Sequence, residues 1–171
     1  INIDGFAFTG NNALNGGDFV LTNENLVHTM HGMSVKSHTG GVFDWEAAAS
    51  KYSYDQDLNR RNGAANFLPA AQNGGAGTVA DGSGTGWTAL ALKGIWRPHV
   101  DHTVDFGVQS DRYVLGMSTR NIAGNWMLDA PGTLANAVGG TTSTNSVYGQ
   151  DAWGFAPLWK TVLGVRVENW S

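Results

Sequence analysis

Two histidine pairs are the residues whose type and spacing first suggest chemistry. His28 and His31 are three residues apart, and so are His99 and His102. Imidazole nitrogens are common metal ligands. The flanking residues predict extended chain, however, and in a strand residues three apart point to opposite faces. We therefore expect polar side chains at turns and on a sheet face, with neither a metal site nor a bound cofactor.

A second group of residues could supply acid–base chemistry: Asp105, Asp111, Arg112, Arg166 and Glu168. General acid–base catalysis requires a pocket that adjusts the pKa values of such groups. Most of these residues alternate with apolar neighbours, which is typical of the wet face of a strand. No motif joins a serine to a histidine and an orienting group. We therefore expect no catalytic residues, and we do not expect an enzyme.

The elements that carry these residues are predicted to be strands. Residues 103–117 have the clearest pattern, with Val104 and Phe106 on one side and Asp105 and Asp111 on the other. Further strands are expected at residues 1–8, 25–38, 43–55, 87–96, 146–155 and 160–170. In the last of these, Arg166 and Glu168 share a face, which predicts a charge ladder with neighbouring strands.

Residues 43–55 leave open both the cause of a change in alternation and the type of secondary structure. The segment begins with strict alternation, but its phase changes near Lys51, where Tyr52 and Tyr54 take the opposite parity. A bulge explains this change, and so does a strand that leaves lipid for water. The run EAAASK at residues 46–51 also suits a helix. The aromatic residues that flank it favour a strand.

The connections alternate in length. Short links are expected at residues 39–42, 97–101 and 156–159, and long Gly-, Asn-, Ser- and Thr-rich stretches at residues 58–84 and 121–144. Long structureless loops are uncommon in compact soluble domains. Alternation of tight turns with long loops is typical of outer-membrane β-barrels. The sequence therefore predicts an all-β, antiparallel up-and-down meander, a partial transmembrane β-barrel of about seven strands.

Composition agrees with this fold and excludes some functions. Only 14% of the residues are charged, and the formal net charge is −4 without a basic cluster, so nucleic-acid binding is not expected. Cysteine is absent, whereas small secreted domains usually carry disulfides. Most tryptophans lie near predicted strand ends, which predicts an aromatic girdle at a membrane interface. These tryptophans are Trp45, Trp87, Trp96, Trp153, Trp159 and Trp170.

Residues 148–170, YGQDAWGFAPLWKTVLGVRVENW, resemble the barrel of TonB-dependent outer-membrane receptors. In that family a strand with an acidic residue and a tryptophan, here Asp151 and Trp153, enters a short periplasmic turn. The next strand then carries a Leu-Gly-x-Arg pattern, here Leu163 to Arg166. Residues 31–57 resemble another hairpin of these receptors.

The resemblance implies a barrel of about 22 strands with an N-terminal plug, in the outer membrane of a Gram-negative bacterium. It also implies import of a scarce nutrient complex such as a ferric siderophore, energised by the TonB system through a periplasmic energy-coupling protein. The sequence lacks plug-like and energy-coupling motifs and a terminal aromatic residue. We therefore expect residues 1–171 to be a fragment of one barrel domain in outer-membrane lipid, with no linker.

Ligand capture is expected in the long loops at residues 58–84 and 121–144, although no individual contact residue is predicted. Two other functions remain open. A soluble secreted β-sandwich or carbohydrate-binding module would bury an apolar face between two sheets. A passive porin or an outer-membrane enzyme would share the barrel but not the active transport.

Overall fold

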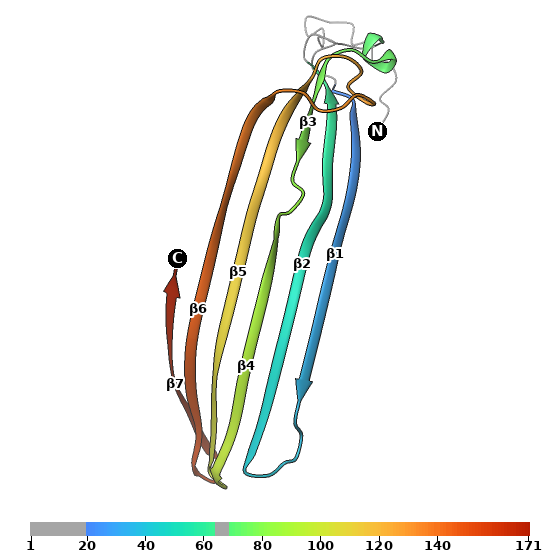
Figure 1. Cartoon of the computed structure of the whole chain (residues 1–171). Coiled ribbons are helices and arrows are strands. Elements are labelled where there is room, and N and C mark those ends of the chain that lie inside the picture. Colours follow the sequence, from blue (N-terminus) through green and yellow to red (C-terminus); the bar gives the residue numbers. More distant parts are fainter. Residues whose placement is uncertain (1–19, 64–68) are drawn as a thin grey trace, which may run out of the picture. The chain divides into compact units, whose positions relative to one another are not determined.

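The computed structural model describes residues 20–63 and 69–171. Within them the chain forms one antiparallel sheet of seven strands (Figure 1), which confirms the predicted all-β, up-and-down fold class. The strands are Thr22–Lys36 (β1), Phe43–Asn62 (β2), Gly77–Asp81 (β3), Gly86–His99 (β4), His102–Ile122 (β5), Leu134–Ala156 (β6) and Trp159–Trp170 (β7). A short 3-10 helix, Ala70–Asn73 (η2), precedes β3. The strand predicted at residues 1–8 lies outside the described residues.

The strand order is β1-β2-β3-β5-β6-β7, and β4 also pairs with β2 and β5. Both β3 and β4 are therefore flanked by the same two strands, and residues 82–85 join them. Strands β1 and β7 are the outermost, and each has one neighbouring strand among the residues that the structure describes.

The described strands are longer than the sequence predicted, most of all β2 with 20 residues, β5 with 21 and β6 with 23. The predicted loop bounds of 58–84 and 121–144 are wrong, because β2 extends to Asn62 and β5 to Ile122, while β3 and the start of β6 occupy further parts. Polar residues there pair in register, with Arg60 opposite Val79. Such pairing uses backbone groups, so polar side chains do not prevent it.

The three short links are confirmed, and two are tighter than predicted. Only residues 100–101 join β4 to β5, and only residues 157–158 join β6 to β7. The pairing of β2 with β4 runs without a shift from Phe43 to Ser53, which excludes a bulge in that pairing near Lys51. Residues 46–51 belong to β2, so the strand interpretation was correct and the helical one was wrong.

The chain divides into two compact units, which we describe separately. Unit 1 comprises the described residues up to His28 together with Tyr54–Thr85 and Leu115–Gly139. It contains both long connections and all the buried apolar side chains of the described chain: Ala71, Val79, Ile122 and Trp126.

Unit 2 comprises Thr29–Ser53, Gly86–Val114 and Gly140–Ser171, and contains the three short turns. It is a single layer of strands without a buried large apolar side chain among the described residues.

None of the helices within residues 20–63 and 69–171 has the length and apolar character needed to cross a membrane.

Candidate functional site

One side of unit 2 is apolar across its strands. Pairing sets Phe43 opposite Trp96 and Trp96 opposite Val104. Four residues after Phe43, Ala47 lies opposite Leu92. Directly opposed residues project to the same side of a sheet. The larger side chains of this apolar face are Phe43, Trp45, Leu90, Leu92, Trp96, Val104, Phe106, Val108, Val147, Leu163, Val165 and Val167.

The apolar face is uncovered. The exposed fraction is 44% for Phe106, 70% for Leu163 and 69% for Val165. No second layer of the described chain covers these side chains. A folded sheet in water normally buries one such face in a core. The described chain therefore leaves the apolar face of unit 2 without a core to cover it.

The opposite side of unit 2 carries a polar ladder over four strands. Lys93 Nζ lies 3.1 Å from Asp105 Oδ2, and Gln150 donates to the same oxygen at 3.2 Å. Arg166 donates to Gln109 Oε1 at 3.3 Å. Arg166 also pairs with Glu168 of its own strand. The shared face of Arg166 and Glu168 is confirmed, but the partner of Arg166 on another strand is a neutral amide and not a charge. These contacts define what we call the polar face.

An aromatic row crosses the polar face on β2, β4 and β5. Tyr52 opposes Trp87, and Trp87 opposes Tyr113. The Tyr52 and Trp87 rings stack with centroids 4.3 Å apart and an interplanar angle of 13°. Trp87 and Tyr113 are each 41% exposed. This row can offer flat ring surfaces to a ligand.

The tryptophans predicted to form a girdle divide between the two faces. Trp45, Trp96 and Trp153 lie on the apolar side by pairing and alternation, whereas Trp87 lies on the polar side. Trp170 opposes Thr144 and also alternates onto the polar side. Near the short turns, Phe155 contacts the rings of Trp153 and Trp159 at centroid distances of 5.6 and 6.4 Å. The girdle interpretation therefore fits only part of the set.

The histidines are engaged singly. In unit 1, His28 bonds to Asp57 at 3.2 Å and stacks on Tyr54, while His31 lines a groove of unit 2. His99 pairs with Asp101 beside the β4–β5 turn. His102 Nδ1 lies 2.7 Å from Asp151 Oδ2, and its ring stacks on Trp153. Nowhere in the described residues do three His, Cys, Asp or Glu side chains gather as metal ligands would.

The residues considered for catalysis are distributed rather than gathered. Asp105 belongs to the Lys93 pair, and Asp111 accepts a hydrogen bond from Gln109 at 2.7 Å. Arg112 projects to the other side of β5, because it directly follows Asp111 in the strand. Among these groups, only Arg166 and Glu168 form a direct pair. The arrangement suits hydration and sheet cohesion, and it brings no nucleophile to a base.

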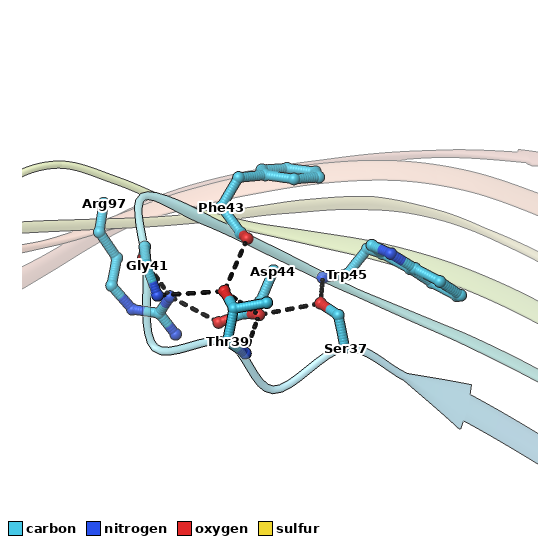
Figure 2. A network of polar contacts seen from close by, with 7 residues as sticks. All are labelled: Ser37, Thr39, Gly41, Phe43, Asp44, Trp45 and Arg97. Carbon is cyan, nitrogen blue, oxygen red and sulfur yellow. Dashed lines mark hydrogen bonds and ion pairs between the residues drawn. The ribbon is translucent and has the colours of Figure 1, made fainter.

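Asp44 forms a cluster that the sequence analysis did not single out (Figure 2). Its Oδ1 accepts bonds from the Thr39 N–H at 2.8 Å and the Ser37 hydroxyl at 2.9 Å. Its Oδ2 accepts from Arg97 at 2.8 Å, and Arg97 also donates to the Gly41 carbonyl. The cluster joins the link between β1 and β2 to the end of β4.

The same bonds act on the charge of Asp44. The Thr39 N–H bond, followed by the Arg97 bond, lowers the pKa of Asp44 far below its ordinary value. The Ser37 and Thr39 hydroxyls act in the same direction. Burial opposes them, because it disfavours the charged form. Asp44 is therefore an ionised clamp for this turn.

Trp126 joins the two long connections of unit 1. Its side chain is 2% exposed, and its Nε1 donates to the Ala71 carbonyl at 2.7 Å. The backbone N–H of Trp126 donates to the Gly75 carbonyl at 2.8 Å. Arg60 donates to the backbone carbonyls of Trp126 and Asp129. The structure thus brings the two segments predicted for ligand capture into contact. The sequence analysis did not single out Trp126; a tryptophan in the middle of a predicted loop is the signal that could have found this anchor.

Comparison with known proteins adds no relative, since no family model, no curated protein and no solved structure matches the chain.

Proposed function

We propose that this chain is part of the wall of an outer-membrane β-barrel, with the apolar face of unit 2 toward lipid and the polar face toward the barrel interior. The observation that carries the proposal is the uncovered apolar face, with the polar ladder on the reverse of the same strands. Such inside–outside alternation is typical of transmembrane barrels.

Energetics favours lipid as the neighbour. Exposed apolar surface costs roughly 25 cal/mol for each Å² kept in water. Leu163, Val165 and Val167 are each more than 60% exposed, so contact with hydrocarbon would remove a penalty that water imposes. Further strands would pair with β1 and β7 and close the sheet, because lipid does not tolerate unpaired backbone groups.

We assign residues 45–53 of β2 and their partners on β4 and β5 to the membrane. About 9–11 residues suffice for a tilted strand to span the bilayer, so β2, β5 and β6 have residues to spare. The short turns and the Asp44 cluster would then lie on the periplasmic side. The Trp153, Phe155 and Trp159 rings suit the adjoining interface.

The resemblance to TonB-dependent receptors supports the finer assignment, import of a scarce nutrient such as a ferric siderophore. The Trp126-anchored connections would contribute to ligand capture, and the Tyr52–Trp87–Tyr113 row would face the path inward. Leu128, 79% exposed and two residues from Trp126, is the most exposed large apolar side chain in the described part of these connections.

Orientation in the membrane is tested with single cysteines, since the chain has none of its own. Spin labels at L163C and V165C should be accessible to oxygen and shielded from a water-soluble relaxation agent in outer membranes. Labels at Q109C and E168C should show the reverse. Equal access of the water-soluble agent to all four positions would contradict the lipid-facing assignment.

Transport is tested separately, in the full protein in a Gram-negative host. Uptake of its nutrient should stop when the proton gradient is collapsed or the energy-coupling protein is deleted. Uptake that continues under both conditions would instead favour a passive porin. The membrane assignment would survive that result.

A further inference from the structure

The apolar face of unit 2 ends in a row of polar residues. Lys51 opposes Thr88, and Thr88 opposes Arg112, so the three side chains leave the sheet on the apolar side. One row nearer the short turns, Ala49 opposes Leu90. Both cationic side chains are exposed. Two cations thus border an uncovered apolar surface.

These two cations have no counter-ion in the described part of the chain, a property they share with Lys36 and Lys160 but not with three other cations of unit 2. Lys93, Arg97 and Arg166 each form an ion pair with a carboxylate. Within the described part of the chain, no carboxylate lies within ion-pair distance of Lys51 or Arg112. Charges in this position therefore remain available to an anion from outside.

A groove adjoins the row. It has a volume of about 260 Å³, and its walls are apolar at Met33, Ala49 and Leu90 and polar at His31 and Lys51. A soluble anion would gain nothing from the apolar walls. An amphiphile would gain from both parts, because its acyl chain is apolar and its head is charged.

We propose that the Lys51–Arg112 row binds the phosphate of a phosphorylated membrane lipid, with an acyl chain of that lipid along the groove. Arg112 supplies a planar fork suited to phosphate oxygens, and Lys51 supplies a point charge. Their aliphatic stems lie along the apolar face while their heads reach the interface. This inference rests on the proposed membrane location.

The test uses the full protein in nanodiscs of phosphatidylcholine, with and without phosphatidic acid as the phosphorylated lipid. Native mass spectrometry counts the retained lipid. The wild type should retain phosphatidic acid, and the K51Q/R112Q variant should retain about tenfold less, equivalent to about 1.4 kcal/mol. The K36Q/K160Q variant, which removes as many cations from elsewhere in unit 2, should match the wild type. The K51R/R112K variant should keep most of the binding.

Two results would overturn the proposal: equal loss of lipid from both glutamine variants, or displacement of the lipid by inorganic phosphate. The first would mean a general charge effect, and the second a site for a free anion. Circular dichroism and nanodisc incorporation report insertion independently. A wild type that does not enter nanodiscs would count against the membrane proposal itself.

Discussion

Asp44 contributes to the fold as a charged acceptor. Four donors from Ser37, Thr39 and Arg97 converge on its two oxygens, and its side chain is almost fully buried. A neutral amide in its place cannot form an ion pair with the guanidinium. Its NH2 group would also face the Ser37, Thr39 or Arg97 donors, which need an acceptor. The turn between β1 and β2 therefore depends on the ionised form.

We expect this dependence to appear as a pH effect on unfolding. Because the pKa of Asp44 is lowered in the folded state, its contribution is present above the ordinary aspartate value of 3.8 and declines as the pH falls below that value. Urea unfolding in detergent at pH 7, 5 and 3.5 should show a decline in the wild type. D44N should be less stable at pH 7 and should decline less. Parallel curves for the two proteins would contradict the assignment.

Trp126 acts on two connections at once, so its loss should be felt in both. We expect W126A to raise amide hydrogen exchange at residues 69–76 and at 123–133, with a local cost of up to about 3–5 kcal/mol. W126F keeps a six-membered aromatic ring and loses the pyrrole part of the indole with its bond to Ala71, so its effect should be smaller. Faster exchange in only one connection would show that the anchor does not couple them.

At the scale of elements, Thr85 maintains the sheet in the link between β3 and β4, which both lie between β2 and β5. Its hydroxyl donates to the Gly116 carbonyl at 3.0 Å and accepts from the Gly116 N–H at 3.1 Å. One side chain thus replaces two ladder bonds between this link and β5. Thr85 is 3% exposed, so water cannot substitute for it readily.

We expect T85V, which conserves shape and removes both bonds, to lower the free energy of unfolding by about 1–3 kcal/mol. T85S keeps the hydroxyl and should lose less. Urea titration followed by tryptophan fluorescence measures both. Equal stability of T85V and the wild type would mean that the bonds to Gly116 contribute nothing net.

The elements show how far sequence patterns reach. Alternation predicted the strands and their faces well in residues 103–117 and 160–170, because apolar and polar residues alternate over most of each segment. The strand ends at residues 58–62 and 134–144 were predicted as loop, since polar and glycine-rich sequence carries no such contrast. Their pairing depends on partners far along the chain, and so do the bonds of Asp44 and Trp126. A single sequence shows neither which distant strands pair nor which distant groups these side chains bind.

For the whole molecule, the decisive property is the difference between the two faces of unit 2. Val162 and Leu163 are neighbours in β7, and Val162 alternates to the side of Arg166 while Leu163 joins Val165. Both are exposed, at 56% and 70%. In water the two positions would be equivalent, whereas in a membrane they would face different media.

We therefore expect V165R to impair folding into lipid vesicles by about 2–4 kcal/mol, the cost of a cation on the lipid side near the bilayer centre. V162R should be nearly neutral, because the same cation would meet the hydrated interior. Urea titrations of the two variants in vesicles provide the comparison. Similar losses for both substitutions would contradict a lipid-facing β7.

The distribution of connections has a consequence for loop grafting. Register in a hairpin is fixed at its tight turn, and here tight turns join β1 to β2, β4 to β5 and β6 to β7. The β2–β3 and β5–β6 connections are thus free to change sequence without altering that pairing. Because Trp126 joins these two connections, a graft meant to change ligand specificity would have to replace both connections together.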